Sequence, residues 1–99
     1  MSEARDIVER VRIDAAHPSL PGHFPGNPVV PGVVLLDRIA AALEKNGGGR
    51  LARIGVVKFL APLKPEEDAE LRILRDAIRV RFSVERDGAA ILRGEGEIA

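Results

Sequence analysis

Three residues in the first half of the chain could cooperate in acid–base chemistry. His23 lies in a loop rich in Pro and Gly, Asp37 follows fourteen residues later in an apolar run, and Gly32 lies between them where that run begins. An imidazole can act as a base, a carboxylic acid can donate a proton, and a glycine amide at a helix start can bind a developing negative charge. The spacing therefore supplies the parts of a general acid–base site.

A rigid loop and a helix are expected to position these groups. Pro fixes φ and Gly permits close backbone approaches, so the Pro- and Gly-rich residues 17–32 predict a stiff, irregular loop. Residues 33–43 predict a helix that is apolar on nearly every side and hence buried. A buried Asp37 either has a raised pKa or needs a hydrogen-bond donor. Simpler readings are that Asp37 pairs with Arg38 or a loop amide, and that His23 is a turn residue.

The run from His23 to Asp37, HFPGNPVVPGVVLLD, resembles the signature of a family of enzymes. It is similar to that of the hot-dog-fold 3-hydroxyacyl-(acyl-carrier-protein) dehydratases of fatty acid synthesis and their relatives in polyene-type pathways. The resemblance implies that His23 removes the α-proton of the substrate and that Asp37 helps to expel the 3-hydroxyl group. It also implies that the Gly32 amide binds the thioester oxygen. No metal and no cofactor are expected.

Three further residues belong to the expected site through the same resemblance. Phe24 would fix the backbone of the catalytic histidine, although an ordinary aromatic residue of the core is an equally good interpretation. Pro31 and Val33 flank Gly32 and are expected to contact the substrate. The family uses Glu at the acidic position in its general dehydratases and Asp in the dehydratase/isomerase branch, and Asp37 matches the second.

The chain departs from the family pattern next to the acid. Arg38 stands where relatives tend to have a small residue, and Ala41 where the general dehydratases tend to have Gln. These departures keep open a second interpretation, a non-catalytic hot-dog module that binds acyl chains or builds a larger complex. A hot-dog thioesterase is a third interpretation, which the His-Phe-Pro-Gly loop argues against.

Composition excludes several other functions. The 99 residues are expected to form one hot-dog domain, residues 1–99. Fifteen basic and fifteen acidic residues cancel and only three residues are aromatic, which argues against nucleic-acid binding. No apolar run approaches the roughly 20 residues that a bilayer requires. The absence of Cys and of a secretory h-region favours the cytoplasm.

The remaining periodicity predicts an α+β hot-dog fold, an antiparallel sheet of four or five strands wrapped around one long buried helix. Strands are expected at residues 6–14, 50–60, 69–75, 78–85 and 89–98, and the triple glycine 47–49 should end the helix. Strict alternation puts Ile78, Val80, Phe82 and Val84 on the buried face, and Asp87-Gly88 predicts a hairpin turn. Glu9 falls on the apolar face of the first strand and weakens that assignment.

The expected partners also follow from the resemblance. The substrate would be carried by acyl carrier protein, with coenzyme A as the alternative, and the exposed bases Lys58 and Lys64 are candidates for steering that acidic partner. His17 is read as a loop residue that could line the mouth of the site. An open sheet edge invites pairing. We therefore expect a homodimer, or a multiple of it, whose sites combine His23 of one subunit with Asp37 of the other.

Overall fold

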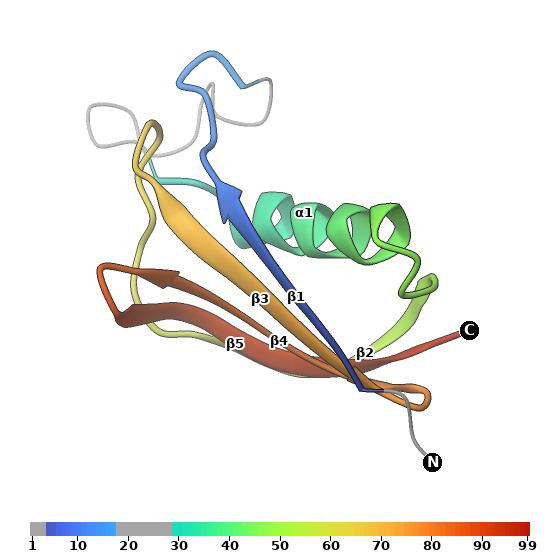
Figure 1. Cartoon of the computed structure of the whole chain (residues 1–99). Helices are drawn as coiled ribbons and strands as arrows, with labels where there is room; N and C mark the ends of the chain where they lie inside the picture. Colours follow the sequence, from blue (N-terminus) through green and yellow to red (C-terminus); the bar gives the residue numbers. More distant parts are fainter. Residues whose placement is uncertain (1–3, 18–28) are drawn as a thin grey trace.

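The structure, a computed structural model, describes residues 4–17 and 29–99, so His23 and Phe24 lie outside the described residues. The described part contains five strands and one helix, which lies across one face of the sheet (Figure 1). The elements are β1 (Ala4–Val11), α1 (Gly32–Lys45), β2 (Leu51–Phe59), β3 (Ala69–Asp76), β4 (Arg79–Arg86) and β5 (Ala89–Ile98).

The sheet is antiparallel throughout, with strand order β1-β3-β4-β5-β2. Strands β3, β4 and β5 form a meander, and β1 and β2 lie at the two edges. The turn between β4 and β5 has positive φ at both central residues, 52° at Asp87 and 80° at Gly88. Such a turn matches the right-handed twist of the strands, so the predicted hairpin is confirmed.

Side-chain alternation builds the core on the face of the sheet that α1 covers. Ala69, Leu71 and Ile73 of β3 are buried, as are Val80, Phe82 and Val84 of β4. The prediction for Ile78 is wrong, because Ile78 precedes β4 and its side chain is 56% exposed. It lies in the β3–β4 turn, where its carbonyl oxygen accepts a hydrogen bond from the amide of Ile98.

The helix is amphipathic, and the prediction that it is buried on every side is wrong. Its buried stripe consists of Val34, Leu35, Ile39, Ala42 and Leu43. The opposite face exposes Val33, Asp37, Arg38 and Ala41. The physical reason is that the sheet covers only one side of the helix, and a second layer would be needed to cover the other.

Glu9, the charged residue on the inward face of β1, bonds to the C-terminal end of α1. Its carboxylate accepts a hydrogen bond from Nδ2 of Asn46 at 2.7 Å and lies 3.3 Å from Nζ of Lys45. Asn46 is the C-cap residue of the helix. Burial of Ile7, Val11 and Ile13 confirms the apolar face of this segment, although β1 ends at Val11, earlier than predicted.

Two glycines of the β2–β5 pair allow a test of how closely these strands must approach. A Cβ atom at Gly96 would overlap the carbonyl oxygen of Arg53, whereas at Gly55 it would make an ordinary contact of 3.5 Å with the carbonyl oxygen of Glu95. We expect Gly96→Ala to lower the free energy of unfolding by about 1–3 kcal/mol, because backbone must shift. Gly55→Ala is the matched control and should lower it much less. Equal urea midpoints for the two variants would contradict this packing.

Candidate active site

An apolar pocket of about 440 Å³ opens at the N-terminal end of α1. Pro31 and Gly32 form one wall, and Phe59 and Leu60 at the end of β2 form another. The remaining lining residues are also apolar: Val29, Val30, Leu35, Ala61, Pro62, Leu63 and Ile91. The pocket therefore suits an aliphatic group held beside the start of the helix.

Gly32 is needed for the close approach of Phe59. A Cβ atom at Gly32 would overlap the Phe59 ring, with the ring atom Cζ at 2.6 Å. Any larger residue would displace the ring, which is 58% exposed and thus free to swing outward. Phe59 was not predicted from the sequence, because an aromatic residue at the end of a strand gives no sign that it meets a glycine in a distant helix.

The first turn of α1 presents backbone N–H groups beside this pocket. The amide of Val34 donates to the carbonyl oxygen of Pro31 at 3.0 Å, while no acceptor among the described residues contacts the amides of Gly32 and Val33. The N-cap residue Pro31 makes no side-chain capping bond, and the first turn carries no acidic residue. Unpaired amides at the positive end of the helix dipole are suited to bind a negatively charged oxygen.

Asp37 does not lie in the wall of this pocket. It is exposed on the face of α1 that the sheet leaves uncovered, so the prediction of a buried carboxylate within one chain is wrong. Within the described part of the chain no ion pair joins it to Arg38, and the simpler reading of an Asp37–Arg38 pair finds no support. Val33 is 61% exposed on the same face, one helical turn before Asp37.

Of the six residues predicted to form the site, the structure brings Pro31 and Gly32 together in the pocket. Val33 and Asp37 lie on the neighbouring exposed face of α1, and His23 and Phe24 fall outside the described residues. His17 is half-buried and its amide donates to the carbonyl oxygen of Asp14 at 3.0 Å. It does not contribute to the pocket lining.

The described residues give two further indications of the class of site. They contain no group of three or more His, Cys, Asp or Glu side chains arranged to hold a metal ion. Among their helices, none has the length and apolar character needed to cross a membrane. The expectation that the reaction needs no metal or cofactor stays a prediction.

Comparison with known proteins identifies the class of protein that this fold and site define. Two solved structures share the hot-dog fold: the dehydratase heterocomplex ApeI:P from Xenorhabdus doucetiae (TM-score 0.79, 21% identity, 98% of this chain and 95% of that one) and an uncharacterized protein from Erwinia carotovora subsp. atroseptica (TM-score 0.82, 23% identity, 98% and 85%). The predicted fold class, an antiparallel sheet with one helix, is confirmed.

The family is shown by a sequence model of the ApeI-like dehydratases, which matches residues 1–95. The chain belongs to this family of ApeI-like dehydratases. It is also similar to proteins named 3-hydroxyacyl-[acyl-carrier-protein] dehydratase FabZ. The Oceanobacillus iheyensis protein is 28% identical, and the match covers all of this chain and 75% of that protein. The Haemophilus influenzae protein is 32% identical, with 84% of this chain and 62% of that protein covered. The Latilactobacillus sakei protein is 37% identical, with 79% of this chain and 60% of that protein covered. The chain thus spans about three-fifths to three-quarters of these relatives.

The contact between Gly32 and Phe59 predicts a local effect of adding one methyl group. Gly32→Ala should displace the Phe59 ring and shift its NMR signals, while the free energy of unfolding changes by less than about 1 kcal/mol, because Ala also favours the helix by about 1 kcal/mol over Gly. Gly55→Ala serves as the control and should leave the Phe59 signals in place. Unchanged Phe59 signals in Gly32→Ala would contradict the contact.

Proposed function

We propose that this protein catalyses the elimination of water from a 3-hydroxyacyl thioester to give the trans-2-enoyl thioester. The observation that carries the proposal is the apolar pocket at Gly32. There the amides of Gly32 and Val33, which have no hydrogen-bond acceptor among the described residues, adjoin a wall suited to an acyl chain. Membership of the ApeI-like dehydratases and the similarity to FabZ proteins support the same reaction.

Each proposed role follows from the chemistry of the elimination. His23 takes the α-proton, and the electrons of the broken C–H bond move toward the thioester oxygen, which accepts a hydrogen bond from the Gly32 amide. These electrons then return to form the Cα–Cβ double bond as the C–O bond at the β-carbon breaks, and the leaving hydroxyl takes a proton from the Asp37 carboxyl to depart as water. Each proton-transfer group contributes roughly 10²–10⁴-fold. Phe24, Pro31 and Val33 are proposed as substrate-side contacts.

The exposure of Asp37 supports a site shared between two subunits. Val33 and Ala41, four residues before and after Asp37, are also exposed, so the acid lies in an apolar stripe that the sheet does not cover. The edge strand β2 and the residue after it add exposed apolar side chains, among them Val56 at 59%, Phe59 at 58% and Leu60 at 51%. An exposed apolar edge favours strand pairing with another chain. We propose a homodimer, or a multiple of it, in which Asp37 faces the His23 loop of the partner.

The proposed carrier of the substrate is acyl carrier protein, as the names of the FabZ relatives state for those proteins. A groove of about 790 Å³ on the sheet face opposite α1 supports this partner. Lys58 lies there directly opposite Arg93, a pair of like charges that an acidic partner would neutralise. Leu60 lines both this groove and the pocket at Gly32, which connects the two at the end of β2. Lys64 is exposed next to the pocket residue Leu63.

The paired roles predict that two single substitutions lower turnover without unfolding the protein. His23→Ala and Asp37→Asn should each lower kcat for hydration of a trans-2-enoyl thioester by about 10²–10⁴-fold. Asp37 is exposed, so Asp37→Asn should leave the thermal midpoint nearly unchanged. His17→Ala and Glu44→Gln, the latter at another exposed acid of α1, are the matched controls and should keep wild-type turnover.

Wild-type kcat in either variant would remove that residue from the mechanism. Release of free thiol by the wild type, with no hydration, would identify a thioesterase instead. Tight binding of the thioester with neither reaction would favour the acyl-binding module.

The shared site predicts complementation between inactive subunits. After exchange of His23→Ala with Asp37→Asn chains, random pairing gives heterodimers with one intact site each, so about one quarter of wild-type activity should return. Mixing either variant with itself is the control. A monomer in sedimentation at micromolar concentration, or heterodimers that stay inactive, would contradict the shared site.

A further inference from the structure

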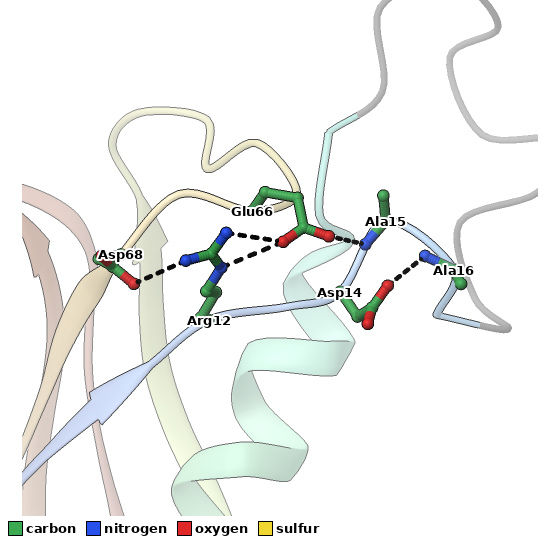
Figure 2. Close-up of polar contacts among 6 residues, drawn as sticks. All are labelled: Arg12, Asp14, Ala15, Ala16, Glu66 and Asp68. Atoms are coloured by element: carbon green, nitrogen blue, oxygen red, sulfur yellow. Dashed lines mark hydrogen bonds and ion pairs between the residues drawn. The ribbon is translucent and has the colours of Figure 1, made fainter.

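Glu66, in the connection between β2 and β3, bonds to three neighbouring residues of the segment that follows β1, Arg12, Ile13 and Ala15 (Figure 2). Its Oε1 accepts a hydrogen bond from the amide of Ala15 at 2.8 Å. Its Oε2 accepts from Nε and Nη2 of Arg12, at 3.1 and 2.9 Å. Its own amide donates to the carbonyl oxygen of Ile13 at 2.8 Å. We call these four hydrogen bonds the Glu66 clamp.

The backbone of Glu66 is held in an unfavourable conformation. Its φ is +68°, in the left-handed region that L-residues other than Asn and Asp seldom adopt. Glycine would fit this turn with less strain. Strain of this kind persists where surrounding contacts enforce it, and it is common at functional sites. The hydrogen bonds of the clamp are contacts that glycine could not supply in full, because it has no carboxylate.

The clamp fixes the chain where it enters residues 18–28, the stretch that contains His23. Ala15 is bound to Glu66, and the next residue is held by Asp14, whose Oδ1 accepts from the amide of Ala16 at 2.8 Å (Figure 2). Where the chain leaves the same stretch, the amide of Val30 donates to the carbonyl oxygen of Leu63 at 2.7 Å. Leu63 and Glu66 belong to one connection, so both ends of the His23 stretch are bonded to the same support.

Arg12 binds the Glu66 carboxylate through Oε2, the oxygen that the Ala15 amide does not use. It is the only described side chain that binds Glu66, and Nη1 of Arg12 also lies 3.9 Å from Asp68. The Arg12 and Glu66 side chains are 54% and 46% exposed, so their attraction alone would add little to folding stability. A pair so placed is better suited to hold a loop in one position than to stabilise the core.

We propose that Glu66 is a positioning residue, which acts through Ala15 and Arg12 to fix residues 12–16, the segment that leads into the stretch containing His23. The proposal rests on the proposed function for its effect on catalysis. It goes beyond that function, because Glu66 does not line the pocket at Gly32.

The clamp requires an ionised carboxylate. The hydrogen bond from the Ala15 amide, and then that from Arg12, lower the pKa of Glu66 below its ordinary value. For a carboxyl group whose pKa is lowered by folding, the stabilisation is present above the unfolded pKa and is lost as pH falls through the folded pKa. The clamp is therefore weakened as pH falls through the folded pKa of Glu66, and a neutral Gln at this position should remove that dependence.

The test uses three variants of Glu66 and one matched control. Glu66→Gln keeps an oxygen for the Ala15 amide and loses the ionic bond to Arg12, whereas Glu66→Ala and Glu66→Gly lose both, and Gly also relieves the backbone strain. Glu70→Gln is the control, because the Glu70–Arg72 ion pair is 2.8 Å long and its side chains are 47% and 53% exposed. All variants are made in the full chain.

We expect kcat to fall about 10-fold to 10²-fold in Glu66→Gly and Glu66→Ala, and less in Glu66→Gln, because a displaced base costs rate while the acyl pocket and hence KM stay the same. The thermal midpoint of Glu66→Gly should stay near that of the wild type. Glu70→Gln should retain wild-type kcat. Equal kcat in Glu66→Gly and the wild type, or a loss of kcat that matches an equal loss of folded protein, would overturn the positioning role.

A readout independent of activity separates this proposal from the proposed function. Hydrogen exchange at the Ala15 amide should speed up in Glu66→Ala and the NMR signals of the His23 ring should shift, with neither change in Glu70→Gln. If the wild type shows no dehydratase activity, the proposed function fails, and these signals alone decide the structural part. Unchanged Ala15 exchange and His23 signals in Glu66→Ala would refute the clamp.

Discussion

Burial of one stripe of α1 against one face of the curved sheet is the constraint on which the rest of the structure depends. Leu35, Ile39 and Leu43 are almost fully buried, and the inward side chains of β3, β4 and β5 complete the same core. A five-stranded sheet and a single helix form only two layers. The outward face of the helix and the β2 edge consequently stay uncovered in one chain, and these are the surfaces on which the composite site is proposed.

The strands at the C-terminal end of the chain could be predicted from sequence because local rules agree there. Inward and outward residues alternate in β4. Asp87 and Gly88 both adopt the positive φ that a two-residue hairpin turn requires. The end of the helix was also predictable from the glycines after Asn46, and its predicted start at Val33 is one residue after the observed start at Gly32. The side of the helix that faces the sheet was missed, because Asp37 and Arg38 are the only polar residues between Val33 and Leu43, and Val33 and Ala41 on the same exposed face are apolar. Hydrophobicity shows a face only where polar residues mark the opposite one.

The parts of the site that depend on contacts distant in sequence could not be predicted. Phe59 meets Gly32 across 27 positions, and Glu66 binds Ala15 across 51. No local pattern records either contact. Glu9 is a second example of a contact that local sequence does not reveal. Its charge weakened the assignment of β1, yet its bonds to Lys45 and Asn46 explain why it is tolerated on the inward face. Resemblance to a family supplied residue roles, whereas physical contacts had to come from the structure.

The exposure of Asp37 changes what the acid requires of its surroundings. A carboxylate sealed in a core would have to meet the cost of burial with partners from its own chain, and none of the described residues provides one. On the open face of α1 the single chain bears no such cost. Desolvation would arise only when a second subunit covers Val33 and Ala41, and the same step would bring a base to the acid. Dimer formation would then both desolvate the Asp37 carboxyl group and place the base beside it. The face of α1 that the two-layer fold leaves uncovered would thus become part of the proposed active site.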